Sequence, residues 1–190
     1  MKLQPFSMAK LPVSLWKNGG GMTREIVCQP PGTDAFNWRV SIAHISKDGP
    51  FSAFPGIDRV ITLLEGGGVW LHAADGSIDH HLETPLQPFA FPGEASIDGK
   101  LLLGACDDFN VMTRRATCRS EVIVCRETQA LPASDAGVLL SLRGDWLVQG
   151  KDPLRTRSGV WWHGAAPGLK LESKSPFGIL LAVTIHQGAA

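Results

Sequence analysis

Short hydrophobic runs, separated by glycine and proline, recur along the whole chain. The runs are rich in Val, Ile, Leu, Phe and Trp, and single polar residues are set within them. The chain has 21 glycines and 13 prolines, and their close spacing leaves little room for helices. We therefore predict β-strands at 24–30, 37–46, 59–66, 68–73, 77–83, 88–92, 100–106, 110–116, 120–127, 137–144, 145–150, 159–164, 169–174 and 177–185.

This many short strands, separated by turns, indicates an all-β sandwich, jelly roll or barrel. Two segments also resemble each other: "RVITLLEGGGVWL" (59–71) and "GVLLSLRGDWLVQG" (137–150) each contain an apolar strand, a glycine turn and a strand with Trp. Aligning Gly66 with Gly144 gives an offset of 78, and "AFPG" lies 71 residues before "WWHG" (161–164). The pattern favours a duplicated β-sandwich. The alternative is that β-hairpins resemble one another without a common origin.

The composition favours a folded globular protein. The chain has 190 residues, of which 44% are hydrophobic, so it is long enough for one substantial core or two small halves. Basic and acidic residues number 18 each, and no run of like charges marks a basic face. Nucleic acid is therefore not an expected partner, because phosphate binding needs a concentrated positive field. The pair Arg114–Arg115 is too short to change this, and we expect it to be solvated or locally paired.

The opening segment of the chain does not suit a secretory signal, and its cysteines do not suit a disulfide framework. Pro5, Lys10 and Pro12 interrupt the apolar run that a secretory signal would need. No later segment approaches the roughly 20 apolar residues of a membrane span. We expect a soluble, cytoplasmic protein with no membrane partner. The four cysteines show no C-x-x-C spacing and are expected to be reduced thiols.

The stretch "WKNGGGMTREI" (16–26) invites comparison with a phosphate-binding loop but lacks its features. A P-loop has its Lys after the glycines and is followed by a helix, whereas Lys17 precedes them and a strand pattern follows Thr23. The glycines are instead expected to form a flexible or positive-φ connection. This explanation leaves the polar neighbours Asn18, Thr23 and Arg24 without a role.

The histidines do not form a recognisable metal site. Two ligands from one strand must lie at i and i+2 to share a face, and none of the six histidines forms an H-x-H pair. His80 and His81 are adjacent, so they should point to opposite faces of a strand. A site assembled from distant histidines stays open, but we expect no metal and no other cofactor.

The sequence contains no motif for nucleophilic catalysis, and several polar residues instead suit a carboxylate ligand. There is no G-x-S-x-G, and no spacing ties Ser, His and Asp into a triad. Arg39, Arg59, Asn110 and Arg114 are embedded in apolar strand sequence. Each arginine can point outward to water. Several arginines with Asn and Trp nearby also suit a carboxylate, because the guanidinium group matches it bidentately.

Four segments of the chain resemble the HutD/Ves family, most closely its Ves branch. They are "LWKNGGGMTREI", "WRVSIAHISKDGPFSAFPGIDRVITLLEGGGVWL", "PLQPFAF" and "DFNVMTR", and the resemblance is continuous from about Leu11 to Arg115. It implies a cupin-like double-stranded β-helix, that is, a jelly-roll sandwich, in two tandem packed halves, as in RmlC-like bicupins. We expect the first half at 1–116, with the family motifs, and a more diverged half at 117–190. Such proteins resemble cupins that lack the metal-binding H-x-H.

The resemblance also implies a function and a site. The histidine-utilisation members are thought to bind a small acidic metabolite of that pathway, such as formylglutamate or urocanate, and to act as regulators. The position of its motif makes Arg59, in "PGIDR", the first candidate for holding a ligand carboxylate. Asn18, Arg24 and Asn110 match further polar positions of the family, and Trp16 and Trp38 are candidates for the pocket walls.

Three functions follow as hypotheses. The first is a non-catalytic small-molecule binder or regulator whose partner is a small anionic metabolite, linked to stress response or histidine utilisation. The second is a metal-independent cupin-type enzyme, an isomerase or hydrolase, with His44 or Glu25 as the acid or base. The third is an interaction protein in which the sandwich serves as a platform for a homodimer.

Overall fold

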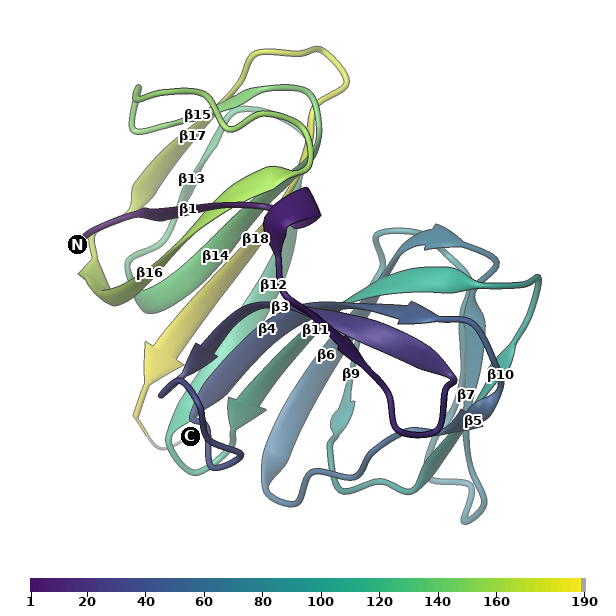
Figure 1. Cartoon of the computed structure of the whole chain (residues 1–190). Helices are drawn as coiled ribbons and strands as arrows, with labels where there is room; N and C mark the ends of the chain where they lie inside the picture. Colours follow the sequence, from purple (N-terminus) through teal and green to yellow (C-terminus); the bar gives the residue numbers. More distant parts are fainter. Residues whose placement is uncertain (189–190) are drawn as a thin grey trace. The chain divides into compact units, whose positions relative to one another are not determined.

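The computed structural model describes residues 1–188, and almost all of its regular structure is β-strand. Within these residues the one helical element is a three-residue 3-10 turn, Met8–Lys10. The chain divides into two compact units. We call Pro12–Thr117 the first unit, and Met1–Leu11 with Cys118–Gly188 the second unit. Figure 1 labels most of their strands and colours the chain from its N-terminus to its C-terminus.

The first unit consists of two antiparallel sheets. One has six strands in the order β2-β3-β4-β11-β6-β9, and the other has four in the order β5-β10-β7-β8. Their bounds are β2 Val13–Leu15, β3 Gly21–Gln29, β4 Trp38–Ile45, β5 Gly49–Pro50, β6 Ile57–Gly66, β7 Val69–Ala73, β8 Asp79–Leu82, β9 Pro88–Pro92, β10 Ile97–Leu101 and β11 Cys106–Arg114. Alternate residues of β7 and β10 are buried, as expected of strands with one face on a core. Ile61 and Leu63 of β6 share one hydrophobic cluster with Val69 and Leu71 of β7.

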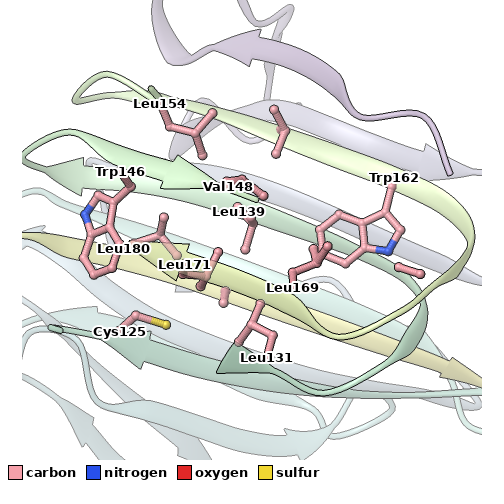
Figure 2. Packing of buried hydrophobic residues seen from close by; sticks show 13 residues of the cluster. Cys125, Leu131, Leu139, Trp146, Val148, Leu154, Trp162, Leu169, Leu171 and Leu180 are labelled. Carbon is pink, nitrogen blue, oxygen red and sulfur yellow. The ribbon is translucent and has the colours of Figure 1, made fainter. Parts of the chain in front are cut away.

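The second unit has the same kind of architecture. A five-stranded sheet runs in the order β1-β16-β14-β18-β12, and a three-stranded sheet in the order β13-β17-β15. Their bounds are β1 Gln4–Ser7, β12 Cys118–Cys125, β13 Gln129–Leu131, β14 Ser134–Arg143, β15 Trp146–Val148, β16 Ser158–Ala166, β17 Leu169–Ser173 and β18 Ile179–Gln187. Trp146, Trp162 and several leucines fill its interior (Figure 2). Gly137 makes this packing possible, because a Cβ there would overlap the indole of Trp162.

Strand order is equivalent in the two units. The run β4-β11-β6-β9 corresponds to β12-β18-β14-β16, and β5-β10-β7 corresponds to β13-β17-β15. Gly66 and Gly144, which the sequence comparison aligned, lie at the ends of equivalent strands, since Gly66 ends β6 and Gly144 follows β14, and both have positive φ. This correspondence is what duplication of one sandwich would produce, and duplication itself stays a prediction.

Most of the predicted strands are present, with shifts of a few residues at their ends. The strand predicted at 100–106 is wrong, because the apolar run there forms the turn between β10 and β11. Leu103 is 86% exposed, and Gly104 adopts a positive φ. The short strands β1, β2, β5 and β13 were not predicted. Pairing of β1 with β16 also places Met1–Leu11 in the second unit, not in the half at 1–116.

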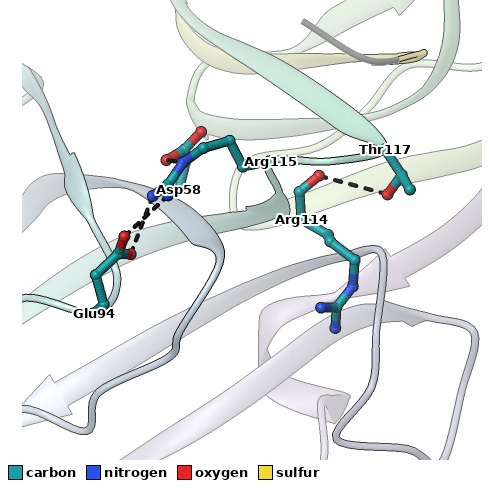
Figure 3. A network of polar contacts seen from close by, with 5 residues as sticks. All are labelled: Asp58, Glu94, Arg114, Arg115 and Thr117. Atoms are coloured by element: carbon teal, nitrogen blue, oxygen red, sulfur yellow. Dashed lines mark hydrogen bonds and ion pairs between the residues drawn. The ribbon is translucent and has the colours of Figure 1, made fainter.

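Polar contacts hold the turn that follows β11 in the first unit (Figure 3). Arg115 Nε donates to Asp58 Oδ1 at 2.7 Å, and its two terminal nitrogens donate to the Glu94 carboxylate at 2.9 and 3.0 Å. Thr117 Oγ1 donates to the carbonyl oxygen of Arg114. Arg115 therefore finds its anionic partners within the same unit, as local pairing of the basic dipeptide predicts.

Candidate functional site

The first unit contains a cavity of about 590 Å³, a size typical of small-molecule sites. Its floor comes from alternate residues of β4 and β11, which share one face of the six-stranded sheet. Further lining comes from Arg59 on β6 and from the segments at 14–18 and 50–54. The polar residues that line it are Ser14, Lys17, Asn18, Thr23, Arg39, Ser41, Ser52, Arg59, Asp108 and Asn110.

Arg59 is a buried cation with few partners. Its side chain is only 6% exposed, and its Cζ lies 5.0 to 5.7 Å from the centroids of three rings, those of Phe51, Phe54 and Phe91. Nε donates to Asn110 Oδ1 at 3.4 Å and Nη1 donates to the Ser52 carbonyl at 3.5 Å, both long for hydrogen bonds. Among residues 1–188 no carboxylate forms an ion pair with this guanidinium. Burial lowers the pKa of Arg59 to about 10.

Asp108 is a buried carboxyl on the same cavity wall. It is 2% exposed, and its side chain accepts no hydrogen bond from the residues that the structure describes. Burial raises the pKa of Asp108 to about 7, the nearby Asp107 adds to the rise, and the charge of Arg59 offsets it only in part. The cavity therefore contains two oppositely charged groups that burial disfavours and that do not pair with each other.

Arg39 provides a second guanidinium on the cavity wall. In the sheet register, Arg39 of β4 and Arg59 of β6 both lie opposite Met112 of β11. The two arginines are thus on alternate strands, roughly 10 Å apart at their backbones. Nε of Arg39 donates to Glu25 Oε2 at 2.8 Å, which leaves its terminal nitrogens free of any described partner.

The hairpin between β2 and β3 supplies part of the cavity lining. Trp16 Nε1 donates to Thr23 Oγ1 at 2.8 Å, and Asn18 Oδ1 accepts from the amide of Gly20 at 2.9 Å. A Cβ on Gly21 would overlap the carbonyl oxygen of His44 and press on the Trp16 ring, whereas Gly19 has open space around it and a positive φ. The predicted turn is confirmed at Gly19, and Gly21 allows two backbones to approach closely.

The structure brings four of the six predicted site residues together. Trp16, Asn18, Arg59 and Asn110 line the cavity. Arg24 and Trp38 do not, since each is adjacent to a residue that does, Thr23 or Arg39, and therefore points to the other face of its strand. Trp38 is fully buried there.

Neither of the two acid–base candidates from the sequence lines the cavity. His44 Nδ1 lies 2.6 Å from Asp107 Oδ1, on the face of β4 opposite the cavity. Glu25 is paired with Arg39 and is not itself a lining residue. Sequence reasoning missed Asp108, although its separation of two residues from Asn110 in one strand places both side chains on the same face.

The histidines are not gathered into a metal site. No group of three His, Cys, Asp or Glu within residues 1–188 is arranged to hold a metal ion. His80 stacks on Phe89, with ring centroids 3.7 Å apart, whereas His81 contacts Trp70, so the two neighbours point to opposite faces as predicted. All four cysteines are buried free thiols. No helix in the described part of the chain is long and apolar enough to span a membrane.

Comparison with known proteins gives consistent matches in sequence and structure. The chain matches the family model described as HutD over residues 8–180. It is 43% identical over 170 residues to Protein Ves of Escherichia fergusonii, covering 89% of this chain and 87% of that protein. HutD from Pseudomonas fluorescens SBW25 has a similar structure, with a TM-score of 0.84 and 28% identity, covering 99% of this chain and 100% of the other.

A more distant structural match concerns the fold alone. Oxalate decarboxylase of Lactobacillus farciminis has a TM-score of 0.64 at 8% identity, covering 100% of this chain and 88% of that one. This neighbour has the cupin fold, so the predicted all-β, cupin-like architecture is confirmed.

Proposed function

The chain belongs to the HutD family, and we propose that it is a non-catalytic protein that binds a small carboxylate metabolite in the cavity beside Arg59. The observation that carries this proposal is the state of Arg59, a cation buried among aromatic rings with two long hydrogen bonds and, within residues 1–188, no ion pair. A buried charge without a partner is costly, and a ligand carboxylate would supply one with bidentate geometry.

The identity of the acid and its biological setting form part of the proposal. Urocanate and formylglutamate are the first acids to test, because the histidine-utilisation members of the family are thought to bind such metabolites. Binding would then serve regulation, in histidine utilisation or in a stress response. Lys17 and Arg39 at the cavity support an anionic ligand independently of this setting, since both add positive charge to its wall.

Thermal-shift screening with urocanate, formylglutamate and glutamate tests the proposal, followed by calorimetry on any acid that raises the midpoint. A ligand at 100 times its dissociation constant should stabilise the fold by roughly 2.7 kcal/mol. Arg59→Met removes the guanidinium and its charge but keeps an unbranched apolar side chain, and we expect it to weaken binding by roughly 10- to 100-fold. The matched control is Arg115→Gln, which removes an exposed arginine outside the cavity.

Two outcomes would contradict the proposal. In one, none of the acids raises the unfolding midpoint of the wild-type protein. In the other, Arg59→Met binds the acid as tightly as wild type does, which would place the ligand elsewhere.

A second candidate function is a metal-independent isomerase or hydrolase, favoured by one observation. Asp108 lies on the cavity wall with its pKa raised by burial to about 7, a value suited to proton transfer near neutral pH. Asp108 thus takes the place that the sequence assigned to His44 or Glu25. Incubating bound acids with the protein and following them by NMR tests this candidate, and an unchanged ligand after many hours would argue against it.

A further inference from the structure

Asp108 is a second buried group on the cavity wall, and the binding of a carboxylate at Arg59 does not use it. A carboxylate ligand satisfies Arg59, but Asp108 would then face an added negative charge while remaining without a hydrogen-bond donor. Among residues 1–188, Asp108 and Arg59 interact electrostatically without forming an ion pair. The inference below rests on the proposed function and names the class of ligand that satisfies both groups.

The register of the sheet shows how the two groups are arranged. Arg59 lies opposite Met112 in the β6–β11 pair, yet its Nε reaches Asn110, the next residue of β11 on the same face. The arginine side chain therefore runs along β11 in the direction of Asp108, which is the next residue on that face. The guanidinium and the carboxyl group face the same part of the cavity, with the Asn110 amide beside them.

We propose that the cavity binds an α-amino acid in its zwitterionic form, with the ligand carboxylate on Arg59 and the ligand ammonium group on Asp108. In an α-amino acid these two groups are attached to one carbon atom, so a single ligand can reach both protein groups when they are close but unpaired. The resulting row of alternating charges is neutral overall, which favours its burial.

The electrostatics of the cavity agree with this assignment. Burial lowers the pKa of Arg59 and raises the pKa of Asp108, so burial opposes the charged form of both groups. A ligand with a carboxylate alone would raise the pKa of Arg59 towards its usual value, but it would raise the pKa of Asp108 still further, since a negative charge raises the pKa of a neighbouring carboxyl group. A zwitterion would bring both pKa values back towards their usual range, because its ammonium group lowers the pKa of Asp108.

Matched pairs of ligands that differ only in the α-amino group provide the test. Suitable pairs are L-alanine and propanoate, L-glutamate and glutarate, and L-phenylalanine and 3-phenylpropanoate, titrated by NMR at pH 8 on the full chain. In every pair that binds, we expect the amino acid to bind at least about tenfold more tightly than its deaminated partner, the advantage of one charge-assisted hydrogen bond.

Two variants assign this preference to Asp108. Asp108→Asn has the same shape without the charge, and we expect it to bring the ratio of affinities within each pair close to one. Asp107→Asn is the matched control, because Asp107 is adjacent in β11 but contacts His44 on the other face, and it should keep the preference. If Asp108→Asn fails to fold, the ratio measured on the wild-type protein decides the question.

The outcomes separate this inference from the proposed function. If acids bind but amino acids bind no more tightly than their deaminated partners, the amino-acid proposal is wrong and the carboxylate site stands. The same conclusion holds if urocanate or formylglutamate binds and no amino acid does. If no acid of any kind binds, both proposals fail.

Discussion

The two units share one strand order, but their interiors differ in chemistry. In the first unit the central strand β11 presents Asp108, Asn110 and Met112 to the cavity. In the second unit the equivalent strand β18 presents Leu180 and Ala182 to a closed hydrophobic cluster. The same backbone arrangement thus supports a polar cavity in one case and a filled core in the other.

Aromatic side chains account for much of this difference. Trp146 and Trp162 are fully buried in the second unit and occupy its interior. In the first unit the rings of Phe51, Phe54 and Phe91 instead surround the Arg59 guanidinium. A cupin-like sandwich is stabilised by filling its interior, whereas a binding site requires that part of the interior remain open and polar.

Removing a tryptophan side chain from the core of the second unit should have the largest effect on stability. We expect Trp162→Ala to lower the free energy of unfolding by about 3–5 kcal/mol, the usual cost of removing a buried Trp side chain. Urea denaturation followed by circular dichroism measures the change. Trp161→Ala is the matched control, because Trp161 lies next to it in β16 on the other, partly exposed face, and its cost should be clearly smaller. Equal costs would show that the indole of Trp162 is not what fills this interior.

Removing the charge of Asp108 should have an intermediate effect on stability, and the size of this effect should depend on pH. The pKa of Asp108 is raised from 3.8 to about 7, so its contribution to stability is complete below pH 3.8 and is lost as the pH rises towards 7. Asp108→Asn avoids this loss. We expect the variant to be more stable than wild type at pH 8, by roughly 1–3 kcal/mol, and close to wild type at pH 4.

Unfolding curves at several pH values check this expectation. The control is Asp135→Asn in the second unit, where the carboxylate accepts a hydrogen bond from the backbone N–H of Gln187 at 2.8 Å and should show no such gain. A difference between Asp108→Asn and wild type that stays constant from pH 4 to pH 8 would contradict burial of a titrating group at this position.

Disrupting the ion pairs of Arg115 should have the smallest effect. Arg115→Gln removes contacts to Asp58 and Glu94, but these side chains are all substantially exposed, and exposed ion pairs contribute little. We expect a shift in the unfolding midpoint smaller than that of Asp108→Asn at pH 8, and no change in ligand affinity. A midpoint shift as large as that of Trp162→Ala would show that the turn after β11 controls the stability of the first unit.

The sequence predicted strands well where turn residues bound them, and less well where pairing alone defines them. Glycines and prolines mark the ends of most strands, so their positions follow from local chemistry. The strands β1 and β5 are only four and two residues long, and they form because distant partners, β16 and β10, offer free edges. No local signal carries that information.

The sequence predicted what kind of site the protein has, but only some of the residues that line it. Arg59 and Asn110 followed from the family motifs, but a motif does not state which of two adjacent strand residues faces a cavity. At 38–39 the sequence favoured Trp38, and the structure presents Arg39. Asp108 was overlooked because carboxylates in strands are usually exposed, whereas this one is buried in a strand that pairs with β4 on one side and β6 on the other.

The run of three glycines in the hairpin predicts an uneven tolerance to substitution. Gly21 has no room for a side chain, so every replacement should disturb the contact between its strand and His44. Gly19 needs only a residue that accepts a positive φ, such as Asn or Asp. Saturation mutagenesis should therefore return glycine alone at position 21 and a small set of polar residues at position 19. Identical glycines in one turn are thus required for different physical reasons.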